Sequence, residues 1–141
     1  MNISKFTQKS VQAVQDLEKV AYQFGNQEIE EEHLLYALLE QEDSLILKLI
    51  EKMEINKEYF LNTVKNALDA KVKVSGGELR FGQYLNKALV NAEDEAKAMG
   101  DEYVSVEHLF LSLLKYPSPG MKKIWSEFGI TRERFLQALS T

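Results

Sequence analysis

Residues 25–39 read GNQEIEEEHLLYALL and residues 100–114 read GDEYVSVEHLFLSLL, and these two stretches decide the fold. Each begins with a glycine, has a β-branched residue four positions later, continues to the string Glu-His-Leu, and ends in an apolar run. The same offset of 75 positions aligns residues 6–66 with residues 81–141 without a gap. Because the match covers apolar positions and glycines alike, each half should form the same unit and bury an apolar face against its twin.

The apolar residues before these stretches repeat at helical spacing, which predicts a first helix in each half. Gly25 and Gly100 should end those helices as left-handed caps. We expect second helices over roughly 30–40 and 105–115 and third helices over roughly 44–53 and 120–128, with fourth helices after the caps Asn56 and Thr131. The prediction is an all-α fold of eight helices, arranged as two pseudo-symmetric four-helix repeats.

Residues 72–78, VKVSGGE, interrupt the helical periodicity and should link the two halves. We therefore expect a single domain over residues 1–141, with repeats at 1–71 and 79–141. Leu38 and Leu113 occupy equivalent apolar positions and should both be buried.

Composition excludes several classes of protein. The chain of 141 residues has 17 basic and 22 acidic side chains and a net charge of −5, which disfavours binding to nucleic acid. It has no cysteine, so disulfides and thiolate metal sites are excluded and a reducing compartment is favoured. No stretch approaches the ~18 apolar residues that span a membrane. We expect a soluble, cytoplasmic protein with neither membrane nor nucleic acid as a partner.

Sequence motifs of catalysis are missing. No phosphate-binding glycine loop is present, so no nucleotide site is expected in this chain. Glu30 and His33 have the spacing of a helical metal pair, but the second half offers Ser105 and His108 instead, so we expect no metal and a histidine hydrogen-bonded to a nearby loop. The acidic run at residues 28–32 should be a solvated helix start. The chain is therefore not expected to be an enzyme or to hold a cofactor.

Four strings carry a resemblance to a known family: KFTQKSVQAVQ, NQEIEEEHLLYALL, KVSGG and GDEYVSVEHLFLSLL. Together they resemble the amino-terminal domain of Clp ATPases, most closely that of ClpB-type disaggregases, over essentially the whole chain. The resemblance implies a mobile module joined to a hexameric AAA+ motor, which is absent here and would hold the ATP and magnesium. Such a module binds exposed segments of unfolded or aggregated proteins.

The resemblance also implies a polar site. In ClpB-type domains a threonine, an aspartate and a glutamate handle substrate, and the matching residues here are Thr7, Asp101 and Glu107. Each has a structural alternative: Thr7 as a helix cap, Asp101 as a turn residue after Gly100, and Glu107 as an acid in the first helical turn. Both readings stay open from the sequence.

An apolar surface beside this site can be proposed from residues outside the inward stripe. The candidates are Val11, Val14, Tyr84, Leu85 and Leu89. The alternative is that they fill the seam between the two repeats, since a paired core needs a wide apolar face. The family's groove is leucine-rich, whereas this chain has Asn91, Glu95 and His108 near the corresponding region.

A second function remains open, namely docking of an adaptor or of a phosphoarginine-bearing protein, as the resemblance to ClpC- and ClpA-type unfoldases implies. Twin sites would then use Thr7, Glu32 and Glu107. Gly82 stands where a second threonine would be needed, which weakens the twin-site version.

Overall fold

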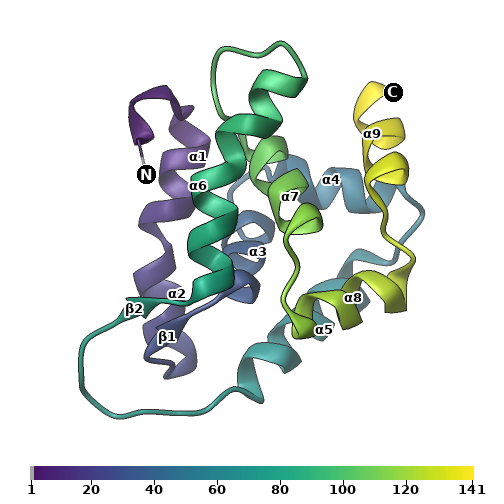
Figure 1. Cartoon of the computed structure of the whole chain (residues 1–141). Helices are drawn as coiled ribbons and strands as arrows, with labels where there is room; N and C mark the ends of the chain where they lie inside the picture. Colours follow the sequence, from purple (N-terminus) through teal and green to yellow (C-terminus); the bar gives the residue numbers. More distant parts are fainter. Residues whose placement is uncertain (1) are drawn as a thin grey trace.

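A computed structural model describes residues 2–141. The all-α fold is confirmed, and each helix of the second repeat has a counterpart in the first (Figure 1). The first predicted helix is divided at Asp16, whereas its counterpart α6 is continuous. The first repeat contains α1 (Gln8–Gln15), α2 (Leu17–Phe24), α3 (Glu31–Leu39), α4 (Leu45–Lys52) and α5 (Lys57–Asp69), after a 3-10 turn at Ile3–Lys5. The second contains α6 (Gln83–Ala98), α7 (Val106–Lys115), α8 (Pro119–Phe128) and α9 (Arg132–Ser140).

The helix ends follow the local signals in the sequence. Asn56 Oδ1 accepts the N–H of Tyr59 at 2.9 Å, and Thr131 Oγ1 accepts that of Arg134 at 3.2 Å, so both expected caps are confirmed. Gly25 and Gly100 have φ of 69° and 73°, in the left-handed region where a side chain would be strained.

Short extended segments join the two repeats, because each segment pairs with one from the other repeat. Strand β1 (Glu28–Ile29) pairs in parallel with β2 (Arg80–Phe81), and Phe6 bridges Val104 in the same sense. We call residues 25–30 the first connector and residues 100–105 the second connector. Each repeat's first helix therefore starts on the connector of the other repeat.

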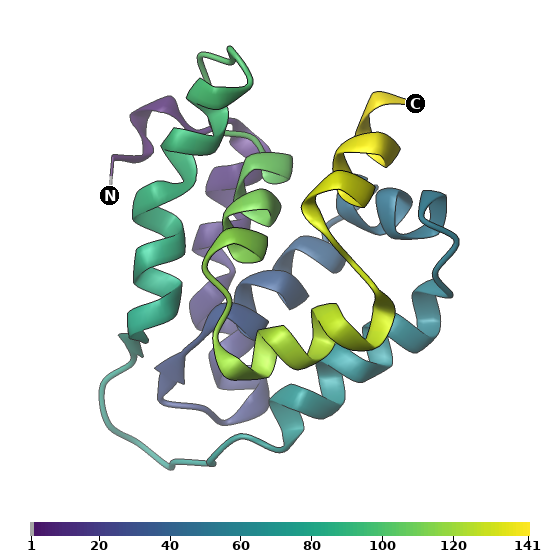
Figure 2. The same cartoon turned by 45° about the vertical axis from the view of Figure 1, so that its right-hand side comes forward.

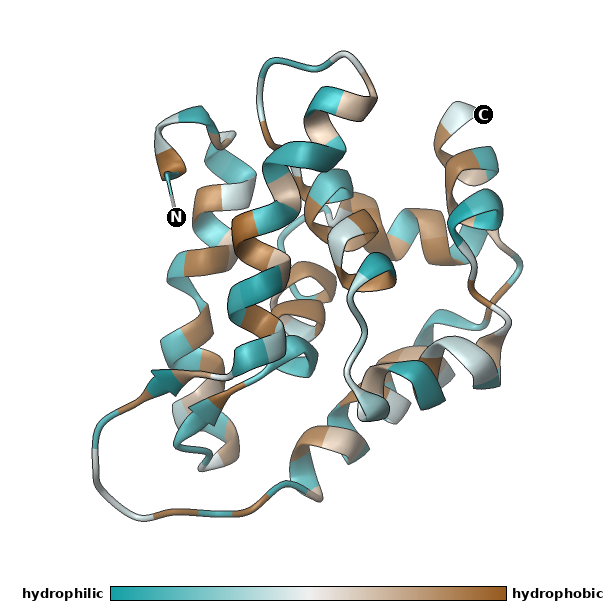
Figure 3. Ribbon diagram, viewed as in Figure 1, coloured by the Kyte–Doolittle hydropathy of each residue, from teal (hydrophilic) through white to brown (hydrophobic). Residues whose placement is uncertain are grey.

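The core is one apolar cluster drawn from both repeats. Leu38 and Leu113 are both fully buried, as expected. Phe60 on α5 meets Phe128 on α8 edge to face, with ring centroids 4.9 Å apart, and so joins the two repeats. Hydrophilic and hydrophobic bands alternate along α6, which has one face in this core (Figure 3).

The segment between α5 and β2 forms a wide loop (Figure 1) that is fastened to the first repeat. Lys73 Nζ donates to the carbonyls of Phe24, at 2.6 Å, and Leu68, at 2.9 Å, near the ends of α2 and α5. Asn26 Nδ2 donates to the carbonyl of Val72 at 3.0 Å. These bonds place the loop over the first connector. Within residues 2–141, no helix is long and apolar enough to cross a membrane.

Candidate functional site

The second connector lies against the start of α1. Thr7 N–H donates to the Val104 carbonyl at 3.0 Å, and Val104 N–H donates to the Lys5 carbonyl at 2.8 Å. Ser10 Oγ donates to the same Val104 carbonyl at 2.7 Å. Thr7 also caps α1, since its Oγ1 accepts the N–H of Ser10 at 3.3 Å. Thr7 therefore sits beside the second connector while it serves as a cap.

His108 fixes the position of Asp101. Its Nδ1 accepts the N–H of Ser105 at 2.9 Å, so the ring proton lies on Nε2, which donates to Asp101 Oδ2 at 2.9 Å. The imidazole is buried, whereas the Asp101 side chain is 47% exposed. The connector thus presents a carboxylate to solvent from a fixed position.

The first connector has the same frame with a neutral partner. His33 Nδ1 accepts the N–H of Glu30 at 2.8 Å, and its Nε2 donates to Asn26 Oδ1 at 2.9 Å. Burial, helped by the nearby positive charge of Lys71, lowers the pKa of His33 to about 4. Because both ring nitrogens are engaged, His33 takes the hydrogen-bonded role rather than that of a metal ligand.

The glutamates of the two Glu-His-Leu strings, Glu32 and Glu107, differ in burial and in ion pairing. Glu32 is buried and forms an ion pair with Lys71 at 3.3 Å, and Lys71 also pairs with Glu30 at 3.0 Å. Burial by itself would lower the pKa of Lys71, but attraction to Glu32 and Glu30 outweighs it and raises that pKa. Glu107 is only partly buried and has no ion pair within residues 2–141.

The expectation of a solvated acidic run is wrong for Glu31 and Glu32, which are 0% and 3% exposed. Both lie against the start of α8: Ser118 N–H donates to Glu31 Oε1 at 2.7 Å, and a Cβ at Gly120 would be 2.5 Å from Glu32 Oε2. Burial raises the pKa of Glu31 to about 7, against the opposing effect of the Ser118 bond. Glu31 and Glu32 therefore contact the other repeat at the start of α8 and help to hold the two repeats together.

A sequence profile of the Clp repeat (R) N-terminal domain family matches residues 5–128. The chain belongs to this Clp N-terminal domain family. The chaperone protein ClpB of Nitratidesulfovibrio vulgaris is 41% identical over 145 residues, and that of Clostridium tetani is 38% identical over 144 residues. Each alignment covers 99% of this chain and 17% of the relative, so this Clp N-terminal domain spans about a sixth of those proteins.

Solved structures show the same fold. The Hsp104 N-terminal domain from Candida albicans has a TM-score of 0.82 and 22% identity, covering 96% of this chain and 90% of that one. A complex of the ClpV N-domain with a VipB peptide has a TM-score of 0.73 and 20% identity, covering 98% of this Clp N-terminal domain and 89% of that chain.

The expected apolar surface is only partly exposed in this Clp N-terminal domain. Leu85 and Leu89 are 0% and 2% exposed, so they fill the seam between helices and do not line an open groove. Val11 and Val14 are partly buried on α1, and Tyr84 is 47% exposed. Tyr84 stands at the start of α6 and Asp101 follows its end, and a helix of 16 residues is about 24 Å long. The structure therefore gathers Thr7, Asp101 and Glu107 around one connector and leaves Tyr84 near the other.

Sequence reasoning expected a histidine bonded to a nearby loop but did not identify Asp101 as the partner of His108, and it missed the ion pair of Glu95. His108 is buried and forms a hydrogen bond with Asp101. The duplicated Glu-His-Leu string could have indicated that the two histidines share a role. Glu95 is buried as well and forms an ion pair with Arg132 at 2.7 Å.

Proposed function

We propose that this domain is the substrate-recognition module of a ClpB-type AAA+ chaperone, acting in the cytoplasm. It would capture exposed segments of unfolded or aggregated proteins and pass them to ATP-driven motor domains that lie outside this chain. The ClpB relatives and the peptide complex of the ClpV N-domain support a peptide-binding role.

One observation carries the choice of site. Asp101 and Glu107 present carboxylates around the second connector, whereas the equivalent Asn26 is neutral and Glu32 is buried against Lys71. Positively charged segments of an unfolded chain should therefore prefer the second connector. The affinity should be micromolar or weaker, because a disordered segment loses conformational entropy when it binds.

The test is a pair of substitutions that keep shape and remove charge, Asp101→Asn with Glu107→Gln. Asn26 already makes the corresponding histidine bond in the first repeat, so Asp101→Asn should keep His108 satisfied, which alanine would not. Calorimetric titration with reduced, alkylated lysozyme should show binding at least about fivefold weaker. Glu18→Gln with Glu58→Gln changes the net charge equally on exposed helix positions and serves as the control. Equal affinities of the two double variants would move the site elsewhere.

Docking of a phosphoarginine-bearing protein is the second candidate, because Thr7 and Glu107 flank the same connector. Glu32 is buried and Gly82 lacks a hydroxyl, so at most the second connector could serve. A peptide with phosphoarginine should then bind more tightly than its arginine form. Equal affinity for the two peptides would contradict phosphoarginine docking and leave the chaperone role as the remaining proposal.

We also propose that the domain performs no catalysis and needs no cofactor, with ATP and magnesium held by the motor of the parent protein. Saturable ATP binding to this chain in calorimetry would contradict this.

The division into repeats at 1–71 and 79–141 with a linker at 72–78 is likewise a proposal, supported by the end of α5 at Asp69 and the start of β2 at Arg80. Cleavage within the linker should leave the two halves associated, because each repeat starts on the other's connector. Gel filtration after cleavage at an inserted protease site would test it.

A further inference from the structure

A pocket of about 580 Å³ lies where the end of α7, the helix α8 and the start of α9 meet. Helices α8 and α9 lie on the side of the molecule away from α1 (Figure 2). The volume is within the range of small-ligand and side-chain pockets. We call it the Trp125 pocket. None of the residues assigned above to the second-connector site lines it.

The wall of the Trp125 pocket is apolar. Leu114, Pro117, Trp125 and Ile130 form it. The indole N–H of Trp125 is directed to the Leu113 carbonyl, at 3.4 Å, so the polar atom of this ring is engaged inside the protein. Trp125 is 6% exposed and Ile130 4%, so both belong to the core and only a small part of the ring can contact a ligand side chain.

The remaining lining residues are Thr131 and three cations, Lys115, Lys122 and Arg132. Both lysines are exposed. Buried Glu95 holds Arg132 through the 2.7 Å ion pair, and the Arg132 side chain is still 38% exposed. A guanidinium has five N–H donors, so one bound carboxylate leaves donors for another. The pocket is thus lined by positive charge, although the net charge of the protein is −5.

This combination is confined to the second repeat. At the offset of 75 positions, Glu40 corresponds to Lys115, Leu47 to Lys122 and Ile50 to Trp125. The first repeat therefore lacks both the indole and the two lysines at these places. Packing of the duplicated fold does not by itself require them.

We propose that the Trp125 pocket binds an acidic peptide segment, with one apolar side chain seated against Trp125 and flanking carboxylates paired with Lys115, Lys122 and Arg132. Charge complementarity selects this occupant, since the pocket's cations attract acidic residues and repel basic ones. The domain then has two docking places of opposite charge preference. This inference does not depend on the proposed role of the second connector.

Trp125 is the only tryptophan of the chain, so no other indole contributes to the fluorescence. The probe is the peptide amide acetyl-Asp-Asp-Leu-Leu-Asp-Asp, compared with forms in which lysine or serine replaces every aspartate. We expect a saturable change in emission with the acidic peptide and binding at least about tenfold weaker with the other two. Equal binding of the three peptides, or no response at millimolar concentration, would overturn the proposal.

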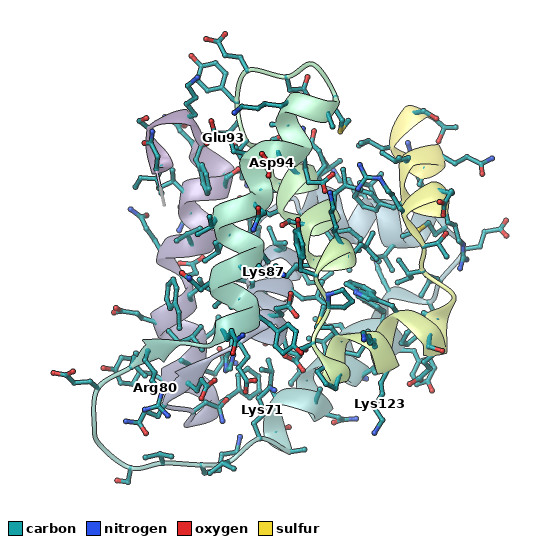
Figure 4. The ribbon with its side chains drawn as sticks, viewed as in Figure 1. Lys71, Arg80, Lys87, Glu93, Asp94 and Lys123 are labelled. Carbon is teal, nitrogen blue, oxygen red and sulfur yellow. The ribbon has the colours of Figure 1, made fainter. Side chains whose placement is uncertain are left out.

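Two neighbouring lysines of α8 supply a matched pair of variants. Lys122 lines the pocket, whereas Lys123 is not among its lining residues and extends away from the helices into solvent (Figure 4). Lys122→Glu should weaken acidic-peptide binding at least about fivefold and Lys115→Glu with Lys122→Glu about tenfold or more, while Lys123→Glu stays within about twofold. Circular dichroism checks that each variant is folded. Equal loss in Lys122→Glu and Lys123→Glu would assign the effect to net charge and refute the pocket.

Discussion

The two connectors share one hydrogen-bond frame and differ in the charge of the side chain that the histidine binds. In each, a buried histidine accepts the N–H of the residue before its helix and donates to a side chain seven positions earlier. That side chain is buried Asn26 in the first connector and half-exposed Asp101 in the second. Because both copies contain this frame, the frame alone is structural, and the proposed binding site rests on the difference between the two copies.

The largest expected effect tests whether the two cores are equivalent apart from their connectors. Leu38→Ala and Leu113→Ala should each lower the free energy of unfolding by about 2–5 kcal/mol, because a buried side chain is lost and a cavity remains. Urea unfolding of each variant measures the loss. Wild-type stability in both variants would contradict a paired core, and a large loss in only one would break the symmetry assumed in the comparison.

The next effect concerns pH and separates the buried groups of the first repeat. His33 has its pKa lowered from 6.5 to about 4, so its contribution to stability is present above pH 6.5 and is lost as the pH falls toward 4. Glu31 has its pKa raised from 4.5 to about 7, so its contribution is present below pH 4.5 and is lost as the pH rises toward 7. Between about pH 4.5 and 6.5 the two slopes should largely cancel.

Glu31→Gln should expose the His33 slope, because it removes one titration and keeps an acceptor for the N–H of Ser118. Relative to its own value at pH 6.5, the variant should lose about 2–3 kcal/mol of stability by pH 4.5, while the wild type changes little. Urea unfolding across this range, with exposed Glu58→Gln as control, measures both profiles. Parallel profiles of Glu31→Gln and wild type would show that Glu31 is not titrating abnormally.

Exchanging the histidine partners tests the comparison directly. Asn26→Asp should destabilise the domain by about 2 kcal/mol, because a buried carboxylate would replace the amide that donates to the Val72 carbonyl. Asp101→Asn should cost less than about 1 kcal/mol, since its oxygen can still accept from His108. Thermal unfolding of the two single variants decides the point. Equal losses of stability in the two variants would contradict the idea that only the second connector accommodates a carboxylate beside its histidine.

The smallest effect concerns the turn after α4 and the turn after its counterpart α8. Gly129 has φ of 61°, and its counterpart Glu54 has φ of 62°, a conformation that is strained for a residue with a side chain. Glu54→Gly should stabilise the domain by up to about 1 kcal/mol, whereas Gly129→Ala should destabilise it. A loss of stability in Glu54→Gly would show that the side chain of Glu54 matters more than its backbone strain.

Features that depend on residues close together in the chain could be predicted from the sequence. The caps at Asn56 and Thr131 and the left-handed glycines Gly25 and Gly100 depend only on local backbone chemistry, and the offset of 75 positions exposed the duplication. The ClpB-type family was also identified from strings of the sequence, and the family comparisons confirm it.

What could not be predicted depends on packing between distant segments. Glu31 and Glu32 look like solvated acids, but the start of α8, more than 80 positions later, covers them. Leu85 and Leu89 lie off the narrowest apolar stripe, and only the three-dimensional seam shows that they are buried. For the candidate site, the residue types were predictable, but the histidine that positions Asp101 and the distance to Tyr84 were not.

The exchanged pairing of extended segments also constrains how the chain can acquire its fold during synthesis. Phe6 has its partner at Val104, so the amino-terminal segment leaves the ribosome long before that partner exists. Closing so long a loop is slow compared with forming a helix, because its entropy must be lost before the contact forms. The helices of the first repeat can form as they emerge, but the start of α1 stays unpaired until the second connector has been translated.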